Sequence, residues 1–393
     1  MFDLLVRGGR VLDPSQALDR VTDVGVQGAH IGGVGDDLLR HGVRGQVIDA
    51  SGLLVTPGWV DLHTHVYWGV APLGVEADRY CLERGVTTAV DAGSAGASTF
   101  PGFKRYVIDV SATRIVAMLN LSAIGMARDD NFGEQAIGEL EDLRWANIDA
   151  ATDVARAHAE VIAGIKIRIS RQHVGDSAEH TREVLRRARA VADLIGKPIM
   201  VHAGNTSITL DEILGTLLRG DVMTHVYHAR TQGVLDESAR VRVSVRAAVE
   251  RGVNFDVGHG AGSFSWRVAR TGLEQGLAPG TISSDIHAWN VAGPVFDLAT
   301  TASKLLHLGL SLPEVVARVT SAPAASIGRA GELGTLAPGA AADITLLRIR
   351  EGEFALQDSA GETELAARRL EPVAVIRNGR AYPCDGHAMD IAR

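Results

Sequence analysis

Residues 57–65 read Pro57-Gly58-Trp59-Val60-Asp61-Leu62-His63-Thr64-His65. The apolar part of this stretch is typical of a buried strand, and the strand ends in two histidines that stand two residues apart. Because side chains alternate between the faces of a strand, we expect His63 and His65 to point the same way. Two imidazoles on one face make half of a metal site, since neutral imidazole binds zinc and related ions.

Seven further apolar runs follow this strand, and helical patterns separate most of them. One helix is expected near Val75–Arg84 and another between His180 and Ile195, where apolar residues recur at helical spacing. The expected strands lie at residues 87–91, 115–120, 164–169, 199–202, 222–225, 253–257 and 281–285. Eight strands that alternate with helices predict an α/β fold of the (β/α)8 TIM-barrel type.

The two ends of the chain differ from the middle, because they are rich in strand patterns and poor in helical ones. Residues 1–54 read as short strands with turns, one of them at Arg7-Gly8-Gly9-Arg10. Residues 337–393 have the same style, and Asn378-Gly379 between apolar runs indicates a hairpin. We therefore expect a small flanking β-sandwich domain built from residues 1–54 and 337–393, with the barrel at residues 55–336.

Composition excludes several classes of protein. The chain has 393 residues, 46% of them hydrophobic, and a net charge of −8 without a long basic run, which argues against nucleic acid or a membrane as partner. Two distant cysteines, Cys81 and Cys384, predict neither disulfides nor a thiolate metal cluster. No signal-peptide pattern and no run of about 20 apolar residues is present. We expect a cytoplasmic protein with a small-molecule substrate, in a symmetric homo-oligomer.

Six polar side chains stand at or near the carboxyl ends of the expected strands, where barrels of this type place their chemistry. They are His63, His65, Lys166, His202, His225 and Asp285. Lys166 stands among isoleucines, where it either reaches the rim with its charge or loses that charge through burial. An uncharged amine can add carbon dioxide, and the resulting carbamate offers two oxygens that can bridge two metal ions.

With these residues the chain resembles the amidohydrolase superfamily over nearly its whole length. The matching segments are residues 57–65, Lys166, His202, His225, Asp285, Gly334-Thr335-Leu336-Ala337-Pro338-Gly339 and Ala342-Asp343-Ile344. The resemblance implies two divalent metal ions, usually zinc. His63, His65 and Asp285 would bind one ion, His202 and His225 the other, and carbamylated Lys166 would bridge them.

The resemblance also implies a reaction. A hydroxide held between the two ions would attack an amide or ester carbonyl, while Asp285 takes its proton and passes it to the leaving group. Residues 166–170, 255–260 and 284–287 are most similar to the amidohydrolase/deacetylase branch. That branch implies cleavage of a small acylated carboxylic acid.

Three other functions were weighed. Cyclic amide and imide hydrolases of the dihydroorotase, dihydropyrimidinase or hydantoinase type share the lysine-bridged site. Dihydroorotases, however, place an arginine two residues after the second histidine, where this chain has Tyr67. Deaminases of the superfamily have a glutamate shortly after the histidine of strand five, where this chain has Ala203-Gly204-Asn205. A non-catalytic scaffold would be expected to lack several of the six ligands.

Four residues are candidates for contact with substrate: Arg168, His259, His287 and Asn290. Arg168 shares the face of Lys166, where it would bind a substrate carboxylate or form a salt bridge. His228 competes with His225 as a ligand, but strand alternation favours His225. The remaining histidines are expected at the surface or in ordinary packing: His30, His41, His158, His173, His180, His307 and His387.

Overall fold

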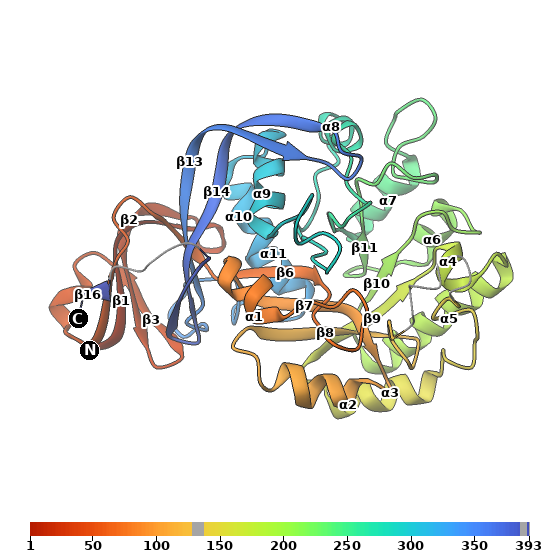
Figure 1. The fold of residues 1–393 in the computed structure, drawn as a ribbon, viewed down its shortest axis with the longest axis horizontal. Coiled ribbons are helices and arrows are strands. Elements are labelled where there is room, and N and C mark those ends of the chain that lie inside the picture. The colour runs from red at the N-terminus through yellow and green to blue at the C-terminus, as the bar shows by residue number, and fades with distance from the viewer. Residues whose placement is uncertain (128–136, 386–390, 393) are drawn as a thin grey trace.

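The computed structural model describes residues 1–127, 137–385 and 391–392, so His387 and part of the expected C-terminal segment lie outside the described residues. Seven parallel strands of this part form one curled sheet in the order β12-β11-β10-β9-β8-β7-β6 (Figure 1). Their bounds are β6 (Trp59–Thr64), β7 (Val86–Gly96), β8 (Arg114–Asn120), β9 (Ile162–Arg168), β10 (Ile199–His202), β11 (Val222–Thr224) and β12 (Asn254–Phe255). The expected mixed α/β fold is confirmed.

The expected eighth strand, residues 281–285, is not a regular strand. It makes only isolated bridges, from Thr281 to Asp256 and from Ile286 to Thr64. Ser283, Ser284 and Asp285 instead use hydrogen bonds to buried carboxylates and to the backbone of β6. Polar side chains thus supplement the backbone hydrogen bonds of this segment, among them the one from His259 N to Ser283 O at 3.2 Å.

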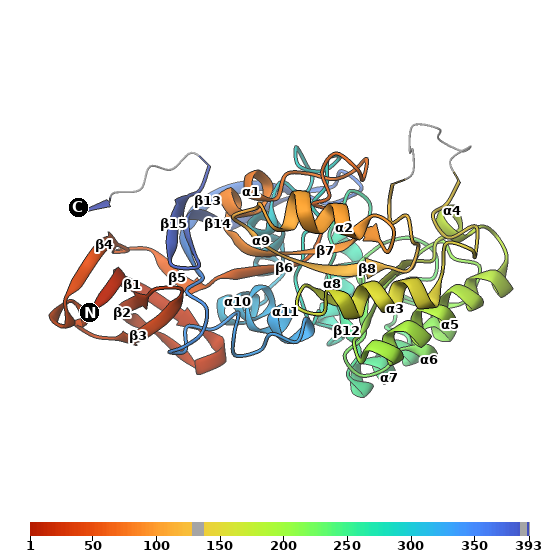
Figure 2. The same ribbon diagram turned by 90° about the horizontal axis from the view of Figure 1, so that it is seen from below.

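Helices lie along the outer side of the curled sheet (Figures 1 and 2). The helix expected at 180–195 is α5 (Ala178–Ile195), which begins at the N-cap Ser177 and ends at Gly196 with a φ of 66°. The helix expected near 75–84 is shorter, as α1 (Ala77–Tyr80) and a 3-10 turn (Leu82–Arg84). The others are α2 (Phe100–Phe103), α3 (Ile148–Ala157), α4 (Arg171–Val174), α6 (Leu210–Thr216), α7 (Val243–Arg251), α8 (Trp266–Glu274), α9 (Leu298–His307), α10 (Leu312–Val319) and α11 (Ser321–Ser326).

A second sheet takes its strands from both ends of the chain. They are β1 (Phe2–Asp13), β2 (Leu18–Gln27), β3 (His30–Gly35), β4 (Val43–Asp49), β5 (Leu54–Pro57), β13 (Ile344–Gln357), β14 (Thr363–Arg377), β15 (Arg380–Pro383) and β16 (Ile391–Ala392). All nine belong to one branched sheet, because β1 pairs with β2, β4 and β5. The expected β-domain built from both chain ends is therefore present, as one branched sheet.

Two turn predictions had different outcomes. The hairpin at Asn378-Gly379 is confirmed, since both residues have positive φ and Arg377 pairs with Arg380. The turn expected at Gly8-Gly9 is wrong, because β1 continues through an irregularity there. Gly8 takes a φ of 72°, and Gly9 packs where a Cβ would meet Val55 and Ala50. The glycines thus form a bulge rather than a turn.

The hairpin β13–β14 connects the second sheet to the curled one. Figure 1 shows it arching from the β-rich end of the molecule to α8. Leu370 N donates to Ser303 Oγ of α9, and near the tip Ser359 N donates to Phe264 O. Ser359 Oγ also accepts from the backbone of Ser263 and Phe264. The hairpin tip therefore holds the loop that follows β12.

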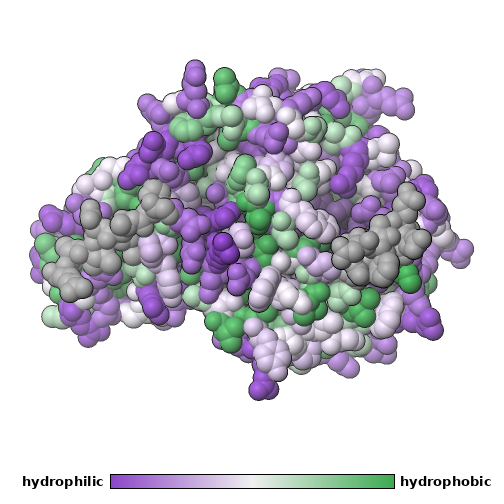
Figure 3. All heavy atoms as spheres, viewed as in Figure 1, coloured by the Kyte–Doolittle hydropathy of each residue, from purple (hydrophilic) through white to green (hydrophobic). Residues whose placement is uncertain are grey.

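The outer surface is mostly polar. On the face drawn in Figure 3, hydrophobic residues form small separate patches among hydrophilic ones. Within the described residues, every helix is too short or too polar to cross a bilayer.

Candidate metal centre

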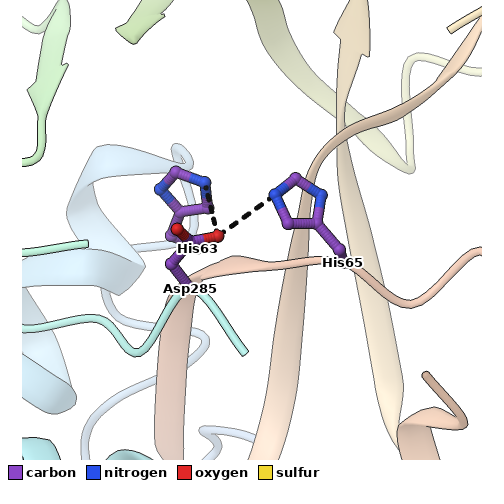
Figure 4. A group of neighbouring side chains, drawn as sticks. All are labelled: His63, His65 and Asp285. Atoms are coloured by element: carbon purple, nitrogen blue, oxygen red, sulfur yellow. Dashed lines mark ion pairs between the residues drawn. The ribbon is translucent and has the colours of Figure 1, made fainter. Parts of the chain in front are cut away.

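His63, His65 and Asp285 meet at the carboxyl end of β6. His63 Nε2 and His65 Nε2 lie 3.3 and 3.2 Å from the same oxygen of Asp285, Oδ1, and Figure 4 shows both rings beside that carboxylate. All three side chains are buried. Two ligand atoms bound at about 2.0–2.1 Å to one tetrahedral ion are roughly 3.3 Å apart. The spacing therefore fits ligands of a shared metal ion.

His202 and His225 form a pair beside this cluster. His202 is the last residue of β10, and His225 directly follows β11. His202 Nδ1 lies 3.0 Å from His225 Nε2, and the rings of His63 and His225 are 5.0 Å apart. His225 has a φ of 67°, which costs a residue with a side chain about 1–2 kcal/mol. Backbone strain of this kind is concentrated at functional sites.

Lys166 of β9 reaches the same cluster. Its Nζ lies 3.3 Å from His63 Nε2 and 3.5 Å from Met200 Sδ, and the side chain is fully buried. Within the described residues, it forms no salt bridge with a carboxylate. Burial lowers the pKa of Lys166, because desolvation outweighs the attraction of Asp285. A buried lysine of this kind is available as an uncharged amine.

Hydrogen bonds orient two of the histidines as ligands. The Thr224 hydroxyl donates to Asp256 Oδ2 at 2.8 Å, so its oxygen accepts from His63 Nδ1 at 2.9 Å. His225 Nδ1 donates to Gly258 O at 2.6 Å. In both rings the proton therefore sits on Nδ1, and Nε2 presents its lone pair to the cluster. This donor set fits divalent metal ions.

Glycines lie against three of the candidate ligands. A Cβ at Gly93 would lie 2.6 Å from Lys166 Cγ, and one at Gly258 would lie 2.8 Å from His225 Nδ1. A Cβ at Gly260 would collide with the Asp285 carboxylate. All three glycines have positive φ. The backbone can approach the ligands this closely only because these residues lack side chains.

The substitution Gly93→Ala is expected to lower metal content and activity by more than its cost to the backbone explains. Gly220 provides a matched control, because its φ of +89° equals the +90° of Gly93 within a degree and nothing lies within 4 Å of its Cβ position. Gly220→Ala should lose about 1–2 kcal/mol of stability for its backbone conformation, and Gly93→Ala should lose that amount plus the cost of the contact with Lys166. Elemental analysis of the folded proteins should find metal loss in Gly93→Ala alone. Equal metal content in both would show that Gly93 does not position Lys166.

The backbone at Asp285 is held by buried polar groups. Its N–H donates to His63 O at 2.7 Å, and Ser284 N donates to Asp61 Oδ1 at 2.9 Å. The Asn290 amide donates to Asp285 O at 2.7 Å and accepts from His287 N at 2.9 Å. Burial raises the pKa of Asp285. These contacts fix the carboxylate against the two histidines.

The four expected substrate contacts have different surroundings. Arg168 donates to both oxygens of the buried Glu139, at 2.6 and 2.7 Å, which is the salt bridge weighed as its alternative role. His259 is fully buried, and its Nε2 lies 2.8 Å from Lys304 Nζ. The amide of Asn290 is engaged with backbone. His287 lies at the cluster, with its ring 6.4 Å from that of His65.

His228 is separate from the ligand pair, but not for the expected reason. Its Nδ1 accepts from Arg230 N at 3.1 Å, and Tyr227 is in the core with its hydroxyl bonded to Leu277 O. Strand alternation does not apply here, because β11 already ends at Thr224. His225 then turns through its positive φ toward the cluster.

Several residues of the site were missed. His173, which was expected at the surface or in ordinary packing, is buried with its ring 5.7 Å from that of His202. No sequence spacing typical of metal ligands marks three other residues, Glu139, Thr224 and Asp256. Only their positions beside strand ends could have indicated them. Asp256 accepts from three hydroxyls, those of Thr224, Thr281 and Ser283. Such a carboxylate supports a histidine that binds metal.

Comparison with known proteins adds to this geometry. The model of the amidohydrolase family matches residues 54–381. A deacetylase of Brucella anthropi is 36% identical over 83% of this chain and 79% of its own length. A deacetylase of Enterococcus faecalis is 31% identical over 97% of this chain and 99% of its own. A crystal structure described as an adenine deaminase has a TM-score of 0.89 at 31% identity, over 98% of this chain and all of that one.

Proposed function

Because this chain belongs to the amidohydrolase family and is a hydrolytic enzyme, we propose that it removes the acyl group from a small acylated carboxylic acid. The bond cleaved is an amide or ester. The observation that carries the proposal is the buried cluster of His63, His65 and Asp285, with Lys166 beside it. Relatives described as deacetylases match most of the chain, and this similarity supports an acylated substrate.

Two divalent metal ions, expected to be zinc, belong to this proposal. His63, His65 and Asp285 would hold one ion, and His202 and His225 the other. Lys166 would bridge them as a carbamate, since its amine can add carbon dioxide with loss of a proton. When bound, the ions supply polarisation of the scissile carbonyl and a water of lowered pKa.

The chain's own residues supply the proton transfer. Asp285 is positioned to take a proton from the attacking water and to give it to the leaving group, as base and then acid. In the metal-free protein, burial raises the pKa of its carboxyl group. The burial of His63, His65, Lys166, His225 and Asp285 keeps bulk water from the reacting atoms, while His202 is only partly buried.

The architecture is part of the proposal as well. Residues 281–286 would complete a (β/α)8 barrel, because they bridge to Thr64 and to Asp256 at the two ends of the curled sheet. We propose the division into residues 1–54 with 337–393, and residues 55–336, although its first boundary falls within β5 of the second sheet. A symmetric homo-oligomer stays a prediction.

Particular residues of this chain give less support to a dihydroorotase, a deaminase or a scaffold. Tyr67, where dihydroorotases have an arginine, is buried against Phe103 and donates to Thr99 O, so it offers no cation to a carboxylate. His202 is followed by Ala203 and Gly204 rather than by the acid of the deaminases. A scaffold would not need the uncharged lysine.

The expected result is release of acetate from N-acetylated amino acids or O-acetylated 2-hydroxy acids by the zinc-loaded protein. Activity should disappear after dialysis against a chelator and return with zinc. Dihydroorotate, a hydantoin and adenine are the comparison substrates. A higher kcat/KM for ring opening or for ammonia release would contradict the proposal.

A further inference from the structure

Arg230 is a cation near the candidate metal centre, and the opposite charge that acts on it is that of Asp285. It follows His225 by five residues, and its backbone N–H donates to His228 Nδ1. In the part of the chain that the structure describes, its guanidinium makes no hydrogen bond and no salt bridge. Arg230 is an exposed residue, so a ligand that enters from solvent can reach its guanidinium.

The guanidinium lies between the loops that follow β10 and β12. A Cβ at Gly204, two residues after His202, would lie 3.4 Å from Arg230 Cδ. A Cβ at Gly262 would lie 2.8 Å from Arg230 Nη2, and Gly260 of the same loop touches the Asp285 carboxylate. Arg230 therefore occupies the rim between two candidate ligands, where each loop places a glycine against its side chain.

The other cations near Asp285 already have roles. Lys166 is within the cluster, and Arg168 is neutralised by two hydrogen bonds to Glu139. Arg230 also lines a cavity of about 380 Å³ together with the loop around residues 228–237 and Arg267 of α8. It thus combines access from outside with proximity to the site.

We infer that Arg230 binds the carboxylate of the acylated substrate, and that it, rather than Arg168, determines specificity for an acid. This inference rests on the proposed function. A guanidinium binds a carboxylate through two parallel N–H···O bonds, which fix orientation as well as charge. The substrate class that follows is an acylated acid whose carboxylate stands close to the acyl group, because Arg230 borders the ligands.

The test compares Arg230→Met with Arg267→Met, a control that removes a guanidinium from the same cavity. The substrates are an N-acetylated amino acid and an O-acetylated 2-hydroxy acid, each as the free acid and as its primary amide. Arg230→Met should lower kcat/KM for the acids roughly 10- to 100-fold, the value of a hydrogen-bonded charge pair, and leave the amides unchanged. Arg230→Lys should lower kcat/KM for the acids less than Arg230→Met does, because lysine keeps the positive charge but cannot form two parallel hydrogen bonds.

Other results would contradict either the role of Arg230 or the proposed function itself. If the wild type cleaves acids but Arg230→Met lowers acid and amide equally, or neither, Arg230 does not bind the carboxylate and the proposed function stands. If the wild type releases acetate from no substrate of the panel, the proposed function fails and the inference fails with it. Thermal unfolding of each variant separates loss of fold from loss of recognition.

Discussion

Replacement of Lys166 by alanine is expected to reduce kcat by about 10³-fold or more and to lower the number of bound metal ions. Loss of a residue that merely supports a ligand costs about 10–100-fold, and loss of a bridging ligand should cost more. Because the change truncates one of the largest fully buried side chains, thermal unfolding of the variant is measured as well. The measurements are kcat on the best acyl substrate and elemental analysis of the same sample.

A matched control and a rescue sharpen this prediction. The control is the loss of a lysine away from the site. Lys104 begins the π-helical turn Lys104–Ile108 and pairs with Asp109, which follows that turn. Lys104→Ala should behave as wild type. Added acetate or propionate should restore part of the activity of Lys166→Ala, since a small carboxylate can replace the two oxygens of the carbamate. Full activity and full metal content in Lys166→Ala would eliminate the bridging role.

Asp285→Asn should have the second largest effect, a fall in kcat of roughly 10²–10⁴-fold, the usual contribution of a general acid–base group. Asparagine keeps the shape of the side chain but neither takes up nor delivers the proton. Asp193 on α5, which is exposed and pairs with Arg189, provides the control Asp193→Asn. Both variants should unfold at similar temperatures.

Metal analysis distinguishes the two roles of Asp285. If Asp285→Asn retains both ions and still loses activity, the carboxylate acts in proton transfer. If it loses one ion, the carboxylate is needed as a ligand. A variant that keeps its metal and stays within tenfold of the wild-type kcat contradicts both roles.

The sequence predicted the positions of the candidate ligands well, because those positions depend on short-range patterns. Strand periodicity directly explains why His63 and His65 share one face. The apolar runs of β9 and β10 likewise indicate where these strands end. Once the strands assemble in parallel order, their carboxyl ends share one edge, and the polar side chains at that edge meet.

The features that were missed depend on contacts between distant segments or on backbone conformation. Glu139, the partner of Arg168, is 29 residues away in a segment without a strong pattern. The positive φ values of His225 and Asp285 have no sequence signal of their own, so strand alternation misjudged the neighbours of His225. Residues 281–285 were expected to form a strand, but serine and aspartate hydrogen bonds hold them instead.

The most direct test of the account is the metal content of the full chain, purified without chelator and measured by elemental analysis. We expect about two divalent ions per chain, because five candidate ligands and Lys166 form two adjoining sets. One ion per chain, unchanged after incubation with zinc and bicarbonate, would contradict the bridged pair. Absence of any ion after reconstitution would contradict the metal-dependent mechanism itself.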